Sequence, residues 1–311
     1  MGNKPLVSVA IITYNQEEYL KECIESVLAQ DYDNIEIVVA DDASQDGTQA
    51  MLKEYDKKYP EKFKLVLSKI NQGITANSNN ALFACKGKYI AWLGGDDLFL
   101  PSKITKQVKF MEANPELVIS YHNIDRFDSN TGRTLYYVND VRGRHEGNVD
   151  VIIEHGTFMG ACSVMVLREA CPKCFNPKIP IASDWLFWIE TCYNGKIGYI
   201  DEILSKQRRH SNNITKLTTY KTKLKERILT LNLVNTKKIS NPNSIRKAKA
   251  RVQYHYALNC ILNDSNEASV AIKDSIESHD LGWKQKLIQI LIKFKIQDIY
   301  KFYYKHFKAK E

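Results

Sequence analysis

Two adjacent carboxylates, Asp96 and Asp97, stand after an apolar run and a pair of glycines in GKYIAWLGGDDLFLP, residues 87–101. The run at 89–93 is typical of a buried strand in a parallel sheet, and ligands of such sheets collect beyond the carboxyl ends of the strands. Neighbouring carboxylates repel each other unless a cation lies between them and their target. A divalent cation that also holds a phosphate fits, because Mg²⁺ and Mn²⁺ prefer oxygen ligands. A solvated turn explains the same text, so the interpretation depends on the rest of the chain.

Further acids fall at comparable points. Asp41 and Asp42 follow the apolar run at 35–40, and Asp184 precedes the apolar segment WLFWIE. A nucleotide base, a metal-bound diphosphate and a proton acceptor would use the three acidic positions in chain order. The structural alternatives are a turn with a helix cap at Asp41 and Asp42, and a helix N-cap at Asp184.

The elements that must position these acids alternate along the first half of the chain. Strands are predicted at 7–12, 35–40, 63–67, 89–93 and 117–121, and helices at 16–30, 48–59, 74–85 and 101–114. This alternation predicts right-handed crossovers and a parallel sheet, so the fold class is α/β. The polar text at 125–149 predicts a β-ribbon or a mobile loop. Later expectations are strands at 158–167 and 200–207, a helix at 184–193, and helices with many lysines from 220 onward, with a break at 240–244.

Charge is distributed unevenly over the 311 residues, whose net charge is +8. Residues 201–311 carry 23 Lys and Arg against 10 Asp and Glu, whereas residues 1–200 carry 21 against 26. The basic C-terminal third predicts an anionic partner, either a membrane surface or a polyanionic substrate. We expect no nucleic-acid partner, because no recognisable nucleic-acid module accompanies the charge.

Six blocks of the sequence together resemble the family 2 glycosyltransferases of the GT-A fold. In order over residues 6–213 they are VSVAIITYNQEEYLKECIESVLAQ, EIVVADDASQDGT, NQGITANSNNAL, GKYIAWLGGDDLFLP, ASDW and QRRHSNN. The resemblance implies a Rossmann-like, mostly parallel sheet flanked by helices at 1–215, which would bind the nucleotide sugar and carry out catalysis. It leaves a basic helical region at 216–311 for contacts with an acceptor, a membrane surface or another subunit.

The resemblance also implies a nucleotide site. Its residues would be Thr13, Tyr14, Asn15, Asp42, Asn71, Gly73 and Asp96. Asp42 would accept a hydrogen bond from the N3–H of uracil or thymine, since a carboxylate is an acceptor only. The helix after Gly73 lacks the Arg that the family often has there and reads Asn77-Ser-Asn-Asn-Ala.

A divalent metal, Mn²⁺ or Mg²⁺, is implied at Asp97, Asp96 and His210. Asp97 is the favoured direct ligand, because Gly94 replaces the first acid of a strict Asp-x-Asp motif. Asp184 matches the family's catalytic base, which takes the proton of the acceptor hydroxyl in an inverting transfer. On the acceptor side, we expect Trp185, His155 and Gly160.

The expected function is therefore metal-dependent inverting transfer of a sugar, of the hexosyltransferase type. The donor would be a nucleotide sugar, with UDP favoured, and the acceptor a hydroxyl of a cell-surface glycan, glycolipid or glycoprotein. A catalytically silent scaffold that binds a sugar nucleotide remains an alternative. A sugar nucleotidyltransferase is disfavoured, because the Gly-rich, Arg-containing loop of that class is absent after the first strand.

The C-terminal text at 283–307 combines apolar residues at helical spacing with lysines. Such helices lie on anionic membranes, or pack on the catalytic domain or on a second subunit of a homo-oligomer. No apolar run approaches ~18 residues, and the N-terminus has no cleavage-site pattern. We therefore expect a cytoplasmic protein, with peripheral attachment at the inner face of the membrane as the variant that the basic tail suggests.

Overall fold

The computed structural model describes residues 4–211, 213 and 218–308. It divides into two compact units. The N-terminal unit comprises Met1–Ile152 and Thr157–His210, and the C-terminal unit comprises Ile153–Gly156 and Ser211–Glu311. The expected boundary between 215 and 216 lies outside the described residues. The short segment 153–156, expected in the first domain, groups with the C-terminal unit.

The first half of the N-terminal unit is a parallel sheet. Its strands are β1 (Val7–Thr13), β2 (Ile35–Asp41), β3 (Phe63–Leu67) and β4 (Tyr89–Gly94), and its crossover helices are α1 (Glu17–Leu28), α2 (Thr48–Lys58) and α3 (Ile74–Ala84). The strands lie in the order β3-β2-β1-β4, and each neighbouring pair is parallel. Valine and isoleucine fill β1 and β2 because helices cover both faces of the sheet. The α/β fold expected from the sequence is confirmed.

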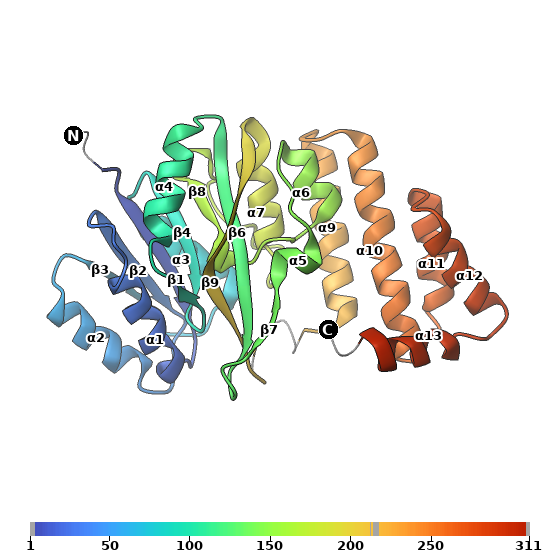
Figure 1. Ribbon diagram of the computed structural model, residues 1–311, viewed down its shortest axis with the longest axis horizontal. Helices are drawn as coiled ribbons and strands as arrows, with labels where there is room; N and C mark the ends of the chain where they lie inside the picture. The colour runs from blue at the N-terminus through green and yellow to red at the C-terminus, as the bar shows by residue number, and fades with distance from the viewer. Residues whose placement is uncertain (1–3, 212, 214–217, 309–311) are drawn as a thin grey trace. The chain divides into compact units, whose positions relative to one another are not determined.

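The second half of the sheet is mixed. After β4 the order continues β8-β6-β9-β5, with β5 (Leu98–Phe99), β6 (Leu117–Asp128), β8 (Met165–Leu167) and β9 (Lys196–Arg209). β8 is antiparallel to β4 and β6, while the two longest strands, β6 and β9, run parallel side by side (Figure 1). The strand expected at 158–167 is shorter than predicted, because a 3-10 turn at Ala161–Ser163 precedes it.

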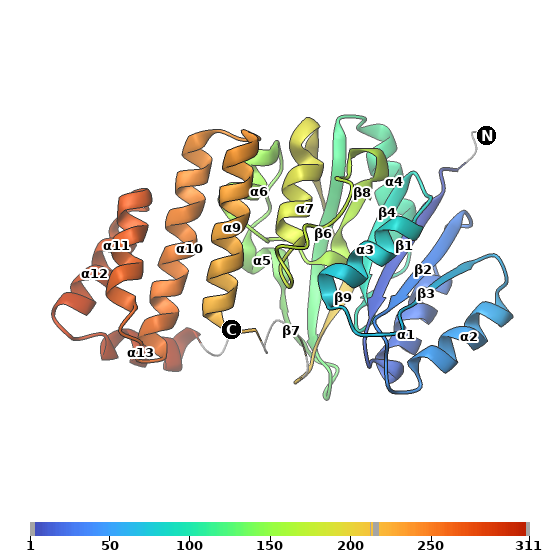
Figure 2. The same ribbon diagram turned by 180° about the vertical axis from the view of Figure 1, so that it is seen from behind.

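Helices cover the two faces of the sheet in a way that the crossovers dictate. α1, α2 and α4 (Lys103–Ala113) lie on the face toward the viewer in Figure 1, and α3 and α7 (Asp184–Thr191) lie on the face toward the viewer in Figure 2. α1 buries Leu20, Ile24 and Val27, and α4 buries Ile104, Val108 and Met111. Both helices thus present residues i, i+4 and i+7 to the sheet, as an amphipathic helix does.

The polar text at 125–149 forms ordered elements. β7 (Thr134–Tyr137) pairs with β6, so the ribbon expected there is present, and α5 (Val138–Arg142) and α6 (Val149–His155) follow. Neither helix was predicted, because both are short and lack an extended apolar periodicity.

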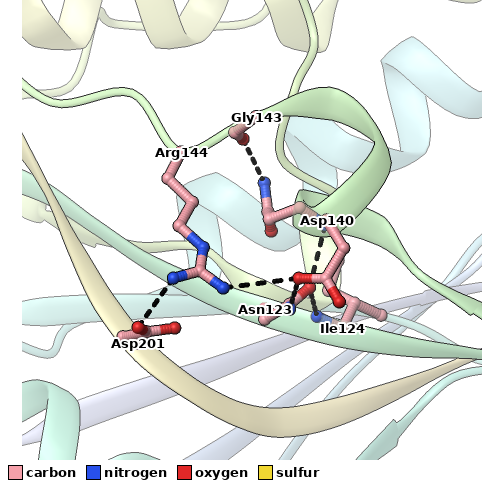
Figure 3. A network of polar contacts seen from close by, with 7 residues as sticks. Asn123, Ile124, Asp140, Gly143, Arg144 and Asp201 are labelled. Atoms are coloured by element: carbon pink, nitrogen blue, oxygen red, sulfur yellow. Dashed lines mark hydrogen bonds and ion pairs between the residues drawn. The ribbon is translucent and has the colours of Figure 1, made fainter.

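Figure 3 shows the polar contacts that hold α5 against β6 and β9. Asn123, at an irregularity in the β6–β9 pairing, accepts the backbone N–H of Asn139 at 2.8 Å. Arg144 pairs with Asp140 at 3.4 Å and with Asp201 at 2.7 Å. Polar side chains therefore fix this segment together with Val138, which is buried in the hydrophobic core.

The C-terminal unit is helical. Its main helices are α9 (Tyr220–Lys237), α10 (Pro242–Leu262), α11 (Ala268–Ser278), α12 (Trp283–Lys293) and α13 (Asp298–Tyr303). The expected break near 240–244 is confirmed, since Asn241 caps α10 and Pro242 occupies its first turn. Within the described part of the chain, every helix is too short or too polar to cross a membrane.

Candidate functional site

Three strand ends meet at one edge of the sheet. Thr13, at the end of β1, pairs with Asp41 on β2, and the preceding Ile12 pairs with Gly94 on β4. The N–H of Asp42 donates to the Thr13 carbonyl at 3.1 Å. The two Asp-Asp pairs therefore flank the end of β1, which is the edge where parallel sheets bind ligands.

The two glycines before the second acid pair leave room at this edge. A Cβ on Gly95 would lie 2.9 Å from Thr13 Oγ1, so only glycine lets the chain pass so close to β1. A Cβ on Gly94 would lie 2.9 Å from Asp96 Oδ1 and 3.7 Å from Asp97 Oδ2. The two carboxylates thus border one small space that Gly94 keeps open.

Asp42 holds the turn at 71–73. Its Oδ1 accepts the backbone N–H of Gln72 and its Oδ2 accepts that of Gly73, each at 2.8 Å. Gly73 has a φ of +88°, which favours glycine, and its N–H also lies 3.2 Å from Asn71 Oδ1. Asp42 itself is buried, with 3% of its surface exposed, and each of its carboxylate oxygens accepts one of these two hydrogen bonds. Asp42, Asn71 and Gly73, three of the residues expected at the nucleotide, are thus brought together by hydrogen bonds.

Asp41, by contrast, is a structural residue. Its carboxylate is fully buried and accepts the Ser44 N–H at 3.1 Å, the Ser44 hydroxyl and the Gln49 side-chain amide at 2.7 Å. These bonds hold the loop between β2 and α2. The turn role that the sequence allowed for this pair therefore belongs to Asp41.

The segment after β1 lies against the same loop. Asn15 donates its N–H to Ser44 Oγ at 2.8 Å and accepts the Gln45 N–H at 2.7 Å. Thr13 is buried, whereas Tyr14 and Asn15 are exposed. The side chains expected at the base and ribose thus surround the end of β1, and the Tyr14 ring is the one presented to solvent.

The end of β9 returns to the second acid pair. β5 pairs antiparallel with β9, with Leu98 opposite Lys206. Continuing that register brings the Arg208 N–H to Asp97 Oδ1 at 3.0 Å, and His210 Nε2 lies 2.9 Å from Asp96 Oδ2. Residues more than a hundred positions apart in sequence therefore meet at one turn.

Arg208 is a site residue that the sequence reasoning did not select. Its buried guanidinium donates to the Asp96 carbonyl at 3.0 Å and pairs with Glu22 of α1 at 2.6 Å. The aromatic rings of Tyr19 and Phe127 lie 4.7 and 4.8 Å from it. Its only sequence signal was its place in the QRRHSNN block.

Electrostatics single out Asp97. Its side chain is 5% exposed, and this burial, together with the nearby Asp96 carboxylate, holds the pKa of Asp97 well above its usual range. The Arg126 guanidinium and the Arg208 N–H act in the opposite direction. A cation bound beside the pair would favour the charged form of both acids.

The chemistry of these side chains fits a divalent cation that shares its ligands with a phosphate. Asp96 and Asp97 offer carboxylate oxygens and His210 an imidazole nitrogen, which suit Mn²⁺ or Mg²⁺. Among the residues that the structure describes, however, no group of three or more His, Cys, Asp or Glu is arranged to hold an ion. The expected three-residue centre is not assembled, because Asp97 Oδ1 faces the Arg208 N–H and His210 pairs with Asp96.

Asp184 is the first residue of α7. It is half-buried, and its Oδ1 accepts the N–H of Trp185 at 2.8 Å. The preceding Ser183 lies with its hydroxyl 2.8 Å from that of Thr75, which donates to the Ile179 carbonyl at 2.7 Å. Since Thr75 belongs to the first turn of α3, directly after Gly73, the turn held by Asp42 and the segment that leads to Asp184 are connected. The N-cap position belongs to Ser183 rather than to Asp184.

The asparagines of α3 are structural. Asn77 is buried and donates to the carbonyls of Thr13 and Ala40, at 3.3 and 2.9 Å, so it bridges the ends of β1 and β2. Asn79 exchanges two hydrogen bonds with the backbone of Phe175. These contacts explain why amides occupy the helix in which the family often has Arg.

On the expected acceptor side, the structure corrects one residue. Trp185 is 2% exposed and donates its indole N–H to the Ile152 carbonyl at 3.0 Å, so it has no open ring face for a sugar. Gly160 is half-buried, and a Cβ there would lie 2.7 Å from Ile124 Cδ1. His155 is exposed at the end of α6 and groups with the C-terminal unit.

Comparisons with known proteins show the family of the chain. The model of the family described as Glycosyl transferase family 2 matches residues 8–175. An uncharacterized glycosyltransferase of Haemophilus influenzae is 32% identical over 222 residues, which cover 68% of each chain. An uncharacterized protein of Mycobacterium tuberculosis is 31% identical over 211 residues, 67% of this chain. The chain spans 60% of the length of that mycobacterial protein.

Among solved structures, S. aureus TarS 1–349 in complex with UDP is similar, with a TM-score of 0.67. The likeness covers 96% of this chain and 91% of TarS 1–349, at 17% sequence identity. TarS 1–349 is also known in complex with UDP-GlcNAc. At this identity the likeness shows the fold alone, and it confirms the GT-A architecture expected from the sequence.

Proposed function

Because the chain belongs to glycosyl transferase family 2, we propose that it transfers a sugar from a nucleotide sugar to a hydroxyl group of an acceptor. The observation that carries the proposal is the convergence of the turn held by Asp42, the pair Asp96–Asp97 and His210 at one edge of the sheet. The proposed catalytic domain is 1–215, and 216–311 is proposed to serve partner contacts.

The proposed nucleotide is UDP. The Asp42 carboxylate accepts hydrogen bonds from two backbone N–H groups. Because a carboxylate oxygen can accept more than one hydrogen bond, Asp42 suits the N3–H of uracil as a further donor. Tyr14, directly after β1, is exposed and would cover the base or ribose. TarS, a protein of the same fold, is known in complex with UDP, which supports this choice.

The proposed diphosphate site is the turn after β4. Asp96, Asp97 and His210 would hold a divalent metal there, with Asp97 as the direct ligand. When bound, such a metal neutralises charge that develops on the leaving diphosphate. Arg208 would keep the turn in place through its hydrogen bond to the Asp96 carbonyl.

The proposed general base is Asp184. It would take the proton of the acceptor hydroxyl while the hydroxyl oxygen forms a bond to the anomeric carbon. The hydroxyl oxygen approaches from the face opposite the diphosphate, and the bond from that carbon to the diphosphate oxygen breaks with its electron pair on the diphosphate. The configuration therefore inverts. The proposed acceptor is a cell-surface glycan, glycolipid or glycoprotein.

Thermal unfolding tests the assignment. Purified protein is heated with UDP, GDP and their sugars, with and without Mn²⁺, because a ligand that binds only the folded state raises its melting temperature. We expect UDP with Mn²⁺ to raise the melting temperature of the wild type and of Asp184→Asn, but not that of Asp97→Asn. In the transfer assay, we expect Asp184→Asn to be inactive. Asp56→Asn, an exposed acid on α2, is the matched control.

The outcomes separate the proposals. If UDP stabilises the protein but neither the wild-type chain nor any variant transfers a sugar to an acceptor, the result favours the silent scaffold. If UDP raises the melting temperature equally with and without Mn²⁺, the metal is removed from the proposal. Retention of configuration, read from the anomeric proton coupling of the product, would remove the base role of Asp184.

A further inference from the structure

Helix α12 carries an exposed apolar stripe. Its residues are Trp283, Leu287, Ile290 and Phe294, the last directly after the helix, with 43–68% of each exposed. They follow one another at spacings of four, three and four residues. At 100° per residue these positions form a single line along the helix.

The stripe is not needed to fold the C-terminal unit. A second side of α12 packs Ile288 and Leu291 into a core cluster with α10 and α11. On the same side, buried Gln285 donates to the Ser275 hydroxyl at 2.8 Å and to the His279 carbonyl at 3.0 Å. α12 is thus apolar on two sides, of which only one is packed within its unit.

Further exposed apolar residues follow α12 in the sequence. They include Ile296, Ile299, Phe302 and Tyr303, which are 42–61% exposed. Exposed lysines border both segments, at positions 284, 286, 293, 295 and 305. From 283 to 308 the sequence has one carboxylate, Asp298, and it pairs with Lys301 at 3.3 Å. We call the eight apolar residues together with these five lysines the tail surface.

We propose that the tail surface docks onto an anionic lipid bilayer. A stripe of Trp, Leu, Ile and Phe suits the boundary between headgroups and acyl chains, and flanking lysines are attracted by anionic headgroups. A second copy of the chain fits less well, because a two-fold interface sets the same patch against itself and brings lysines together. This surface does not depend on the proposed transfer reaction.

Tryptophan fluorescence offers a direct test. The sequence has four tryptophans, and Trp92, Trp185 and Trp188 are at most 3% exposed, whereas Trp283 is 68% exposed. Full-length protein is titrated with vesicles of phosphatidylglycerol or of phosphatidylcholine, with brominated acyl chains as quenchers. We expect a blue shift and quenching with phosphatidylglycerol, and neither change in the Trp283→Phe variant.

Sedimentation with the same vesicles tests the surface without relying on Trp283. We expect Leu287→Ser with Ile290→Ser to weaken vesicle binding at least tenfold, and Lys284→Glu with Lys293→Glu to abolish the preference for phosphatidylglycerol. Val270→Ser with Lys273→Glu, at exposed positions of neighbouring α11, is the matched control and should bind as the wild type does.

Three results would overturn the proposal. They are equal binding to both lipids, no binding to either, or equal loss in the α11 control. If the protein does not bind vesicles but forms a dimer that Leu287→Ser dissociates, the tail surface is assigned to a second copy instead. Vesicle binding and nucleotide-induced stabilisation are separate measurements, so the failure of one proposal leaves the other standing.

Discussion

The turn after β2 and the turn after β4 both carry two adjacent aspartates, on either side of the same strand. At the first turn, the donors come from the segment that follows it and from one neighbouring turn: Asp41 accepts from Ser44 and from Gln49 in the first turn of α2, and Asp42 accepts from the turn at 71–73. At the second turn, the partners come from the far end of the chain, since Asp97 meets Arg208 and Asp96 meets His210.

The difference shows that the dipeptide does not set the role. Neutral donors surround the first pair and use its oxygens to shape a loop. At the second pair, Asp97 accepts the backbone N–H of Arg208 and Asp96 lies next to His210, and burial raises the pKa of Asp97. The same two letters therefore form a loop-shaping pair after β2 and, after β4, a pair held by a strand that is distant in the sequence.

The largest effect is expected on transfer activity when the second aspartate pair is changed. Asp97→Asn keeps an acceptor for the Arg208 N–H but removes the charge, so activity should fall by on the order of 10²–10³. The free energy of unfolding should change little or increase, because the variant no longer buries a carboxylate next to Asp96. Product formation and urea denaturation measure the two effects. Activity within threefold of the wild type would show that the second pair has no special role.

The opposite pattern is expected at the first pair. Asp42→Ala leaves the N–H groups of Gln72 and Gly73 without their acceptor, which should lower the free energy of unfolding by about 2–3 kcal/mol. The KM for the nucleotide sugar should rise with it. Denaturation curves and steady-state kinetics report both quantities, with exposed Asp33→Ala as the control. A KM change without any loss of stability would contradict the loop-shaping role.

A buried amine behind the second turn gives a pH-dependent test. Burial lowers the pKa of Lys103, at the start of α4, to about 7. The unfolded chain, with a lysine pKa of about 10.4, then binds more protons between these values, so this lysine makes stability rise with pH across that window. Lys103→Met should stabilise the protein by on the order of 1–2 kcal/mol at pH 6 and by less toward pH 10. A gain independent of pH, in denaturation at several pH values, would rule this explanation out.

The smallest effect is expected from Arg208→Lys. Lysine keeps the charge near Glu22 but loses the planar group that lies between Tyr19 and Phe127 and donates to the Asp96 carbonyl, so transfer should slow about tenfold. Arg208 is a positioning residue, because its backbone N–H still reaches Asp97 in the variant. We therefore expect kcat to fall while KM for the nucleotide sugar stays within about twofold. An unchanged kcat would show that the acid turn keeps its position without this guanidinium.

By itself, the sequence determined the elements that are built from local patterns. The apolar runs of β1, β2 and β4, the crossovers between them and the acids at their ends follow from periodicity and from the rule that parallel strands end at one edge. The break before α10 follows from Asn241 and Pro242. These features depend on neighbours within a few residues, which a sequence displays directly.

Only the tertiary structure decided which side chains meet and which are covered. The antiparallel register of β5 with β9 brings Arg208 and His210 to the acid pair, while the packing around α7 buries Trp185 and removes it from the expected acceptor surface. Likewise, α10 and α11 cover one apolar side of α12 and leave the other open. Periodicity reports that a residue is apolar, whereas its burial depends on the distant segment that packs against it.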